Sequence, residues 1–246
     1  MTEKRIALVT GANKGLGFET SRQLAAQGIT VLMGARSAEK GEEAARKLQE
    51  ADLEVEFVLL DITNSDHIRQ ARRLLEDRFG RLDILVNNAG LTHPDEPLFE
   101  SSVQEVSPQV LRATFEVNFF GTVELTQALL PLIKKSAAGR IVNVSSILGS
   151  LTVHSDPKHA MGEVKPFAYD ASKTALNQFT VHLAAALRNT PIKVNSAHPG
   201  WVRTDLGGEE AMMEVDEGAQ TSVRLATLEP DGPSGGFFHF DQKLPW

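Results

Sequence analysis

Short apolar runs alternate with stretches of helical periodicity along nearly the whole chain, and this alternation restricts the fold more than any other feature. The apolar runs are Ile6–Thr10, Thr30–Gly34, Val55–Leu60, Leu82–Asn87, Arg140–Ser145, Lys193–Ala197 and Phe237–Phe240. The stretches of helical period between them are Leu16–Gln27, Ala38–Glu50, Ser65–Phe79, Gln109–Lys135 and Phe167–Arg188. Strands that are apolar on both faces and separated by helices predict a parallel sheet covered on each side.

The predicted fold is therefore a doubly wound, Rossmann-type α/β fold that binds its ligand at the carboxyl ends of the strands. The 246 residues contain no repeat, low-complexity tract or linker, so we expect one domain over residues 1–246. Three stretches are predicted loops or of mixed character, namely Thr92–Ser107, Gly149–Lys165 and Leu206–Asp216. Loops of this length often form lids or substrate walls.

Composition excludes several classes of protein. The formal net charge of −7 argues against a nucleic-acid partner, because phosphates require a basic face. Cysteine is absent, which excludes disulfides, thiolate metal sites and cysteine nucleophiles. The seven histidines show no spacing typical of a metal site. No apolar run suits a signal peptide or a membrane span, so we expect a soluble, cytoplasmic protein without a membrane partner.

A glycine-rich turn joins the first predicted strand to the first predicted helix. It reads Gly11-Ala12-Asn13-Lys14-Gly15-Leu16-Gly17. Glycines at these positions permit a tight turn and a close approach of the backbone to a pyrophosphate, while the helix N-terminus offers free N–H groups to that anion. The alternative is a β–α turn that binds no ligand.

The residues after the second predicted strand favour NADPH over NADH. Enzymes that prefer NAD place an acid there for the ribose 2′-hydroxyl, whereas this chain has Arg36 and no acid before Glu39. Arg36 and Lys14 are suited to flank a 2′-phosphate. The alternative is that both are solvated surface cations.

The only tyrosine of the chain, Tyr169, lies four residues before Lys173 on a predicted helix. This spacing puts the phenol and the ammonium on one helix face. We expect the ammonium to lower the phenol pKa, so that Tyr169 exchanges a proton with a carbonyl oxygen. The alternative is a packed tyrosine beside an exposed lysine.

Two further polar groups support the catalytic interpretation. The strand Arg140–Ser145 runs into Ser146 at the expected ligand edge, where a serine hydroxyl can stabilise negative charge on a substrate oxygen. Asn118 is a polar residue within a largely apolar helical stretch. It either holds a water molecule that supplies protons to Lys173 or makes a packing hydrogen bond, and both roles are compatible.

Together these motifs resemble the single-domain branch of the short-chain dehydrogenase/reductase family over nearly the whole chain. They occur in the order Thr10–Gly17, Asp61-Ile62, Asn87–Gly90, Asn118, Ser145-Ser146, Tyr169–Lys173 and Pro199-Gly200. Within the family, the monomeric carbonyl reductases are most similar, through the segments Gly11–Gly15, Asn118–Thr122, Leu130–Lys134 and Pro199–Asp205.

The resemblance implies NADPH-dependent reduction of an aldehyde, ketone or quinone. Tyr169 is then the proton donor, Ser146 rather than Ser145 orients the carbonyl, Lys173 holds the nicotinamide ribose, and Asn118 positions a relay water. Asp61 and Ile62 are expected at the adenine, and Val202 to Thr204 over the carboxamide and phosphates. The full set of expected cofactor-binding residues is Gly11, Asn13, Lys14, Gly15, Leu16, Gly17, Arg36, Asp61, Ile62, Asn88, Ala89, Gly90, Tyr169, Lys173, Pro199, Gly200, Val202 and Thr204.

One segment departs from the family pattern. Ser146 and Tyr169 are 23 positions apart, which is longer than in many members, and the surplus falls in Gly149–Lys165. In carbonyl reductases a still longer insertion resembles a barrier to the helix pairing that builds tetramers. The shorter insertion here leaves the oligomeric state open, with a monomer favoured and a dimer or tetramer as alternatives. His198 is expected to be structural or to line the site rim, and Trp201 to be a substrate wall or a packing residue. The alternative function is a nucleotide-sensing regulator that kept the fold and lost the chemistry.

Overall fold

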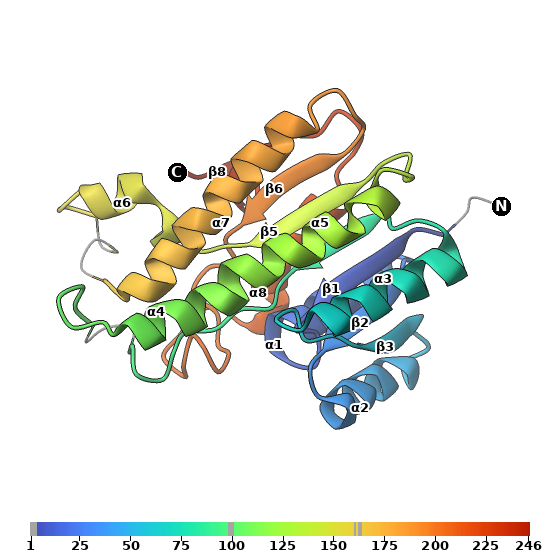
Figure 1. Cartoon of the computed structure of the whole chain (residues 1–246), viewed down its shortest axis with the longest axis horizontal. Coiled ribbons are helices and arrows are strands. Elements are labelled where there is room, and N and C mark those ends of the chain that lie inside the picture. Colours follow the sequence, from blue (N-terminus) through green and yellow to red (C-terminus); the bar gives the residue numbers. More distant parts are fainter. Residues whose placement is uncertain (1–3, 98–100, 160, 162–163) are drawn as a thin grey trace.

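A computed structural model describes residues 4–97, 101–159, 161 and 164–246 of the chain. These residues form an eight-stranded sheet in the order β3-β2-β1-β4-β5-β6-β7-β8 (Figure 1). The strands are β1 (Ile6–Thr10), β2 (Thr30–Ala35), β3 (Val55–Leu59), β4 (Ile84–Asn87), β5 (Arg140–Val144), β6 (Lys193–Ala197), β7 (Phe237–His239) and β8 (Gln242–Lys243). All neighbours pair in parallel except β7 and β8. The predicted doubly wound parallel sheet is confirmed.

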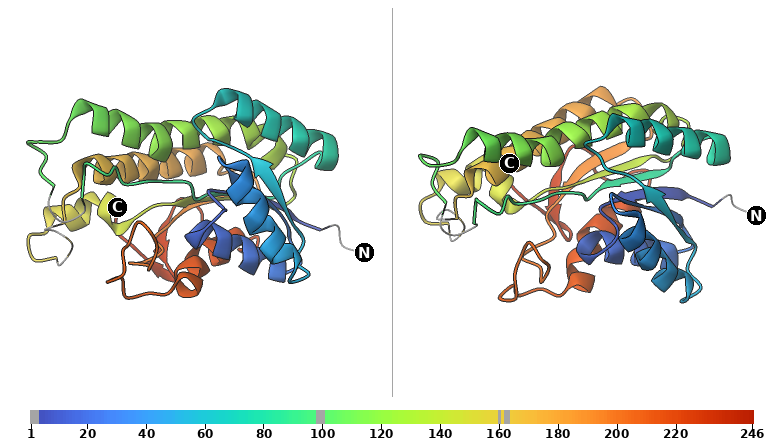
Figure 2. Two further views of the ribbon diagram at one scale, coloured as in Figure 1. Left: turned by 90° about the horizontal axis from the view of Figure 1, so that it is seen from below. Right: turned by 60° about the horizontal axis from the view of Figure 1, so that its bottom comes forward.

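Helices cover both faces of the sheet, as Figure 2 shows. One face carries α1 (Gly15–Ala26), α2 (Ala38–Gln49) and α8 (Val215–Ala226), and the other carries α3 (Ser65–Phe79), α4 (Pro108–Phe115), α5 (Thr122–Ile133) and α7 (Phe167–Ala186). Each layer has its own apolar core against the sheet. Central strands such as β1 and β4 are buried along their whole length, which explains their continuous apolar sequence.

Local signals set several helix boundaries. Asn64 caps α3 by accepting from the amides of Asp66 and His67, and Gly80 ends that helix with a φ of 68°. Ser107 caps α4, where Pro108 occupies the first helical position and needs no amide donor.

The structure differs from the sequence prediction in three segments. The expected helix Gln109–Lys135 is interrupted by a π-helical turn, η1 (Glu116–Gly121), which is a form often found at functional sites. The expected loop Gly149–Lys165 includes α6 (Leu151–Ser155) and the end of a 3₁₀ turn, η2 (Ile147–Gly149). Helix α8 begins inside the mixed stretch Leu206–Asp216 and was not predicted.

The strand order reverses between β1 and β4, and this position locates the ligand site. Strand β1 pairs with β2 on one side and with β4 on the other, so the connections leave in opposite directions. A crevice opens at the carboxyl ends of such a strand pair. The glycine-rich turn after β1 and the serines after β5 both lie at this edge.

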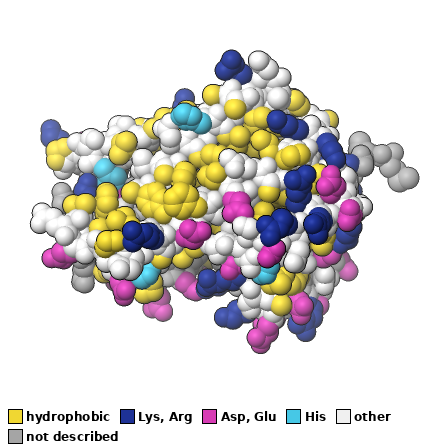
Figure 3. Space-filling view, viewed as in Figure 1, with side chains coloured by type: hydrophobic (Ala, Val, Ile, Leu, Met, Phe, Trp, Pro, Cys, Tyr) yellow, Lys and Arg dark blue, Asp and Glu magenta, His cyan; other side chains and the backbone are white. Residues whose placement is uncertain are grey.

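The outer face of α4, η1, α5 and α7 retains apolar side chains at the surface (Figure 3). Phe115, Phe119 and Phe120 form edge-to-face or tilted ring pairs there, and Phe120 is 53% exposed.

Candidate active site

The turn after β1 has the geometry of a phosphate cradle. Gly11 and Gly15 adopt φ angles of 63° and 54°, which favour glycine. A side chain at Gly17 would collide with the carbonyl oxygen of Gly11. The N-terminus of α1 has no side-chain cap and no acid in its first turn, so its amides are available to an anion.

The segment Asn87–Gly90 holds this turn in place. The Asn88 side-chain amide donates to the carbonyl of Thr10 at 2.8 Å, and the Thr10 hydroxyl accepts from the backbone amides of Asn88 and Ala89 at 2.9 Å. The preceding residue, Asn87, is buried, and its side-chain amide donates to Thr126 and to Asn143 on the neighbouring strand. The motif therefore joins the ends of β1, β4 and β5 by side-chain hydrogen bonds.

Cations gather beside the turn, where a 2′-phosphate is expected. Lys14 forms an ion pair with Asp205 across the site, and Arg36 is exposed directly after β2. Between the turn and α2 lies a surface hollow of about 410 Å³. Its lining residues are Asn13, Lys14, Phe18, Lys40, Glu43, Ala44 and Lys47. Lys40 and Lys47 were not predicted, because helical charge alternation is typical of an ordinary solvated face.

Asp61 and Ile62 follow β3 at the same edge. The Asp61 carboxylate accepts from the amide and hydroxyl of Thr63 at 2.9 and 2.8 Å. The Ile62 side chain is buried in the core between the sheet and α3 and α5. A ligand at this edge therefore meets the backbone of Ile62 rather than its side chain.

Ser146, Tyr169 and Lys173 converge at the carboxyl end of β5. All three are buried, and the Ser146 hydroxyl is near enough to the Tyr169 phenol to favour its ionised form. The Lys173 ammonium donates to the carbonyl of Val144 at 2.8 Å and lies 5.6 Å from the centre of the Tyr169 ring. Ser145 is also buried, and its hydroxyl has no hydrogen-bond partner among the described residues. The geometry thus pairs the phenol with Ser146.

Burial dominates the electrostatics of this pair. It raises the pKa of Tyr169 to about 12, against the opposing effect of the Ser146 hydrogen bond, and the nearby Asp170 raises it further. Burial also lowers the pKa of Lys173 to about 8. The sequence predicted that the ammonium lowers the phenol pKa, but the pKa is raised, because burial of the phenol is the larger effect. The phenol is therefore protonated at neutral pH.

Asn118 lies on η1 and makes packing hydrogen bonds. Its carbonyl accepts from the amide of Leu91 at 2.8 Å, and its amide donates to the carbonyl of Leu91 and to the Ser172 hydroxyl. A Cβ added at Gly90 would lie 3.3 Å from both the Asn118 carbonyl oxygen and the Lys173 ammonium. Asn118 therefore makes packing hydrogen bonds, and its side chain and that of Lys173 both lie close to Gly90.

The segment after β6 closes the other side of the site. Gly200 has a φ of 92°, and a side chain there would collide with Met213. Val202 is buried and pairs with Met213, while Thr204 lies over Gly15. The Trp201 indole donates to the carbonyl of Gly207, and Leu16 packs near Gly218.

His198 has a structural contact beside Ser146. Its Nδ1 accepts from the amide of Ile147 at 3.3 Å, and burial strongly lowers its pKa to about 3. His198 is therefore neutral and supports the turn after β5. This is the structural role, which was one of its two expected roles. Across the described residues, no group of three or more His, Asp and Glu side chains is placed to hold a metal ion.

Sequence reasoning missed a buried acid that caps the helix of Tyr169. Glu96 is 2% exposed, and its carboxylate accepts from the amides of Ala168 and Tyr169 at 2.7 and 3.1 Å. The residue preceding α7, Pro166, provides no side-chain cap. Glu96 is 73 positions before Tyr169, so no local sequence signal connects the two residues.

Comparison with known proteins agrees with this arrangement. The model of the short chain dehydrogenase family matches residues 5–214. Carbonyl reductase [NADPH] 1 of Mus musculus is 35% identical, and the alignment covers 100% of this chain and 99% of that protein. The short-chain dehydrogenase anuI of Penicillium roqueforti is 37% identical, with 91% and 89% covered.

Solved structures give the same result. The NADPH-bound carbonyl reductase from chicken fatty liver superposes with a TM-score of 0.85 at 27% identity, covering 99% of this chain and 100% of that one. Salutaridine reductase from Papaver somniferum gives a TM-score of 0.82 at 30% identity, covering 97% and 100%. The family match, the coverage of nearly the whole of both chains and the convergence of Ser146, Tyr169 and Lys173 lead to one conclusion: this chain belongs to the short-chain dehydrogenase/reductase family.

Proposed function

We propose that this protein reduces a carbonyl group of an aldehyde, ketone or quinone with NADPH, and that Tyr169 supplies the proton. The observation that carries the proposal is the convergence of the buried Ser146, Tyr169 and Lys173 side chains at the end of β5, next to the phosphate cradle. The carbonyl reductases from mouse and from chicken liver are NADPH enzymes by name or by bound cofactor, which supports the same cofactor here.

The cradle fits a dinucleotide. The amides at the start of α1 have no competing acid, and the absence of a side chain at Gly17 lets α1 pack closely against Gly11 and Asn88 of the cradle. Arg36 and Lys14 are assigned to the 2′-phosphate, and Lys40 is added from the lining of the neighbouring hollow. Asp61, the backbone of Ile62, and Asn88 to Gly90 are assigned to the adenosine side. Pro199, Gly200, Val202 and Thr204 are assigned to the nicotinamide side.

Each catalytic group has a separate role in the proposed reaction. NADPH supplies the hydride when bound. Ser146 holds the substrate oxygen beside the Tyr169 phenol, which gives up its proton as negative charge develops on that oxygen. The high pKa of Tyr169 keeps the phenol protonated until then. Lys173 is assigned to the nicotinamide ribose, and Asn118 to a water that restores the proton.

A panel assay tests this function. Purified protein is mixed with 4-nitrobenzaldehyde, phenanthrenequinone or isatin, and consumption of NADPH is compared with that of NADH. We expect turnover of at least one compound and a higher kcat/KM with NADPH. Binding of NADPH without turnover of any carbonyl compound would favour the regulator instead, and a higher kcat/KM with NADH would refute the cofactor assignment.

The proposal also covers the location of the protein and its oligomeric state. In the described residues, no helix is both long and apolar enough to cross a membrane, and we propose a cytoplasmic location. We also propose a monomer, because α6 lies within the insertion and packs on η2, which contacts α7. Sedimentation at several protein concentrations tests the assembly, since a dimer or tetramer would dissociate on dilution.

A further inference from the structure

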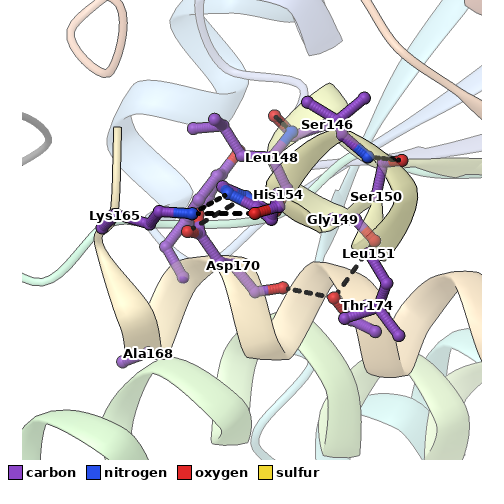
Figure 4. Close-up of polar contacts among 12 residues, drawn as sticks. Ser146, Leu148, Gly149, Ser150, Leu151, His154, Lys165, Ala168, Asp170 and Thr174 are labelled. Carbon is purple, nitrogen blue, oxygen red and sulfur yellow. Dashed lines mark hydrogen bonds and ion pairs between the residues drawn. The ribbon is translucent and has the colours of Figure 1, made fainter. Parts of the chain in front are cut away.

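His154, at the end of α6, lies between the segment of the catalytic serine and the helix of the catalytic tyrosine (Figure 4). Its Nε2 lies 2.8 Å from the carbonyl oxygen of Leu148 and 3.3 Å from Oδ2 of Asp170. Its Nδ1 lies 3.1 Å from the Lys165 ammonium. The side chains of His154 and Asp170 are only 14% and 11% exposed.

These contacts define the tautomer of His154. The Lys165 ammonium has donors and no acceptor, so Nδ1 must accept from it. The proton of the neutral ring is then on Nε2, which donates to the Leu148 carbonyl and, more weakly, to Asp170. Burial lowers the pKa of His154, which favours this neutral form.

The backbone of Leu148 connects His154 to Ser146 through two hydrogen bonds. Its amide donates to the Ser146 hydroxyl at 3.2 Å, while its carbonyl accepts from His154. The next residue, Gly149, packs so closely on α7 that an added Cβ would lie 2.8 Å from Cβ of Lys173. Its carbonyl also accepts from the Thr174 hydroxyl at 3.1 Å. The turn that carries Ser146 is thus fixed on α7 at two points.

Asp170 connects His154 to the helical turn that carries Tyr169. It follows Tyr169 directly in the first turn of α7, and its Oδ1 is buried without a hydrogen-bond partner among the described residues. The nearby charges are the Glu96 carboxylate, which caps α7, and the Lys165 ammonium, which faces His154. The described donor that approaches the Asp170 carboxyl group is therefore the His154 ring.

We propose that His154 and Asp170 are positioning residues that hold the Ser146 hydroxyl against the Tyr169 phenol. Neither touches the reacting atoms in this arrangement. They act through the Leu148 carbonyl and through the first turn of α7. The inference rests on the proposed function, because it assigns a role in the same reaction to the insertion Gly149–Lys165.

The test compares His154→Leu with His154→Gln. Leucine removes both ring nitrogens, whereas glutamine keeps an N–H donor for Leu148 and a carbonyl acceptor for Lys165 and does not titrate. We expect leucine to lower kcat by about tenfold to a hundredfold and to leave the KM for NADPH nearly unchanged, because small displacements of reacting groups act on turnover. Glutamine should restore most of kcat. His159→Gln is the matched control, since His159 is an exposed histidine of the same segment.

A second readout does not depend on turnover. Because the chain has one tyrosine, protein labelled with ¹³C at the tyrosine Cζ gives a single NMR resonance that reports the hydrogen bonding of the Tyr169 phenol. We expect this resonance to move in His154→Leu and to keep its wild-type position in His154→Gln and His159→Gln. An unmoved resonance with wild-type kcat in His154→Leu would overturn the inference, as would a glutamine variant that behaves like leucine. If the wild type reduces no carbonyl compound, the proposed function fails, and the resonance alone still decides the positioning role.

Discussion

Replacing Asp170 by asparagine should change how the stability of the protein depends on pH. Burial, followed by the nearby Glu96 carboxylate, raises the pKa of Asp170 from 3.8 to about 8, against the opposing effect of Lys165. The folded protein therefore keeps a proton that the unfolded chain releases. For an acid whose pKa is raised by folding, the free energy of unfolding falls as pH rises from about 4 to about 8.

The magnitude follows from proton linkage. One fully retained proton corresponds to about 1.4 kcal/mol per pH unit. Between about pH 6 and pH 8, where the folded group passes from fully to half protonated, the wild type should lose about 2 kcal/mol relative to Asp170→Asn. Asparagine keeps an oxygen acceptor for His154 and cannot ionise, so it isolates this contribution.

Urea unfolding followed by circular dichroism at a series of pH values measures the effect. The stability of Asp170→Asn minus that of the wild type should rise with pH across this range. Asp77→Asn is the matched control, because it removes one exposed carboxylate on α3 instead. If the stability difference for Asp170→Asn varied with pH no more than that of the control, the reasoning would be refuted.

Three other substitutions test separate parts of the account. Glu96→Ala leaves two buried amides at the start of α7 unpaired and should lower the free energy of unfolding by about 1–3 kcal/mol, while an unchanged melting temperature would contradict the cap. Arg36→Ala should raise the KM for NADPH about tenfold and leave that for NADH unchanged, and equal effects on both would contradict the 2′-phosphate assignment. Gly149→Ala should destabilise the protein by about 1–3 kcal/mol in urea unfolding, because its Cβ collides with Lys173, and wild-type stability would contradict that close packing.

The sheet was predictable because its strands are buried on both faces. The first strand, Ile6–Thr10, has the predicted bounds, since each of its five residues is apolar or small and each is buried. Helix α8 was not predicted, although its buried face contains Val223 and Leu225 beside small residues such as Gly218 and Ala219.

The convergence of the site was also predictable in outline. Parallel strands end at one edge, so the glycine turn after β1 and Ser146 after β5 had to approach one another. The π-helical turn around Asn118 was not predictable, because it is a change in backbone hydrogen bonding rather than in residue pattern. Contacts such as those of Glu96 and His154 with α7 join distant segments, and only the folded structure brings them together.

The direction of the pKa shift of Tyr169 could be obtained only from the folded structure. A lysine four residues away predicts a lowered phenol pKa, yet burial of both groups outweighs their proximity. The spacing of Tyr169 and Lys173 identifies the pair, whereas the sign of the pKa shift depends on how much water remains around it.

Single-turnover reduction by Tyr169→Phe tests the central claim most directly. Phenylalanine keeps the ring and removes the proton donor, so the hydride-transfer rate with saturating NADPH and a carbonyl compound reduced by the wild type should fall by about a hundredfold or more. NADPH binding, measured by fluorescence titration, should be unchanged, which separates loss of chemistry from loss of fold. A variant that binds NADPH and keeps most of the wild-type rate would contradict the assignment of Tyr169 as the acid.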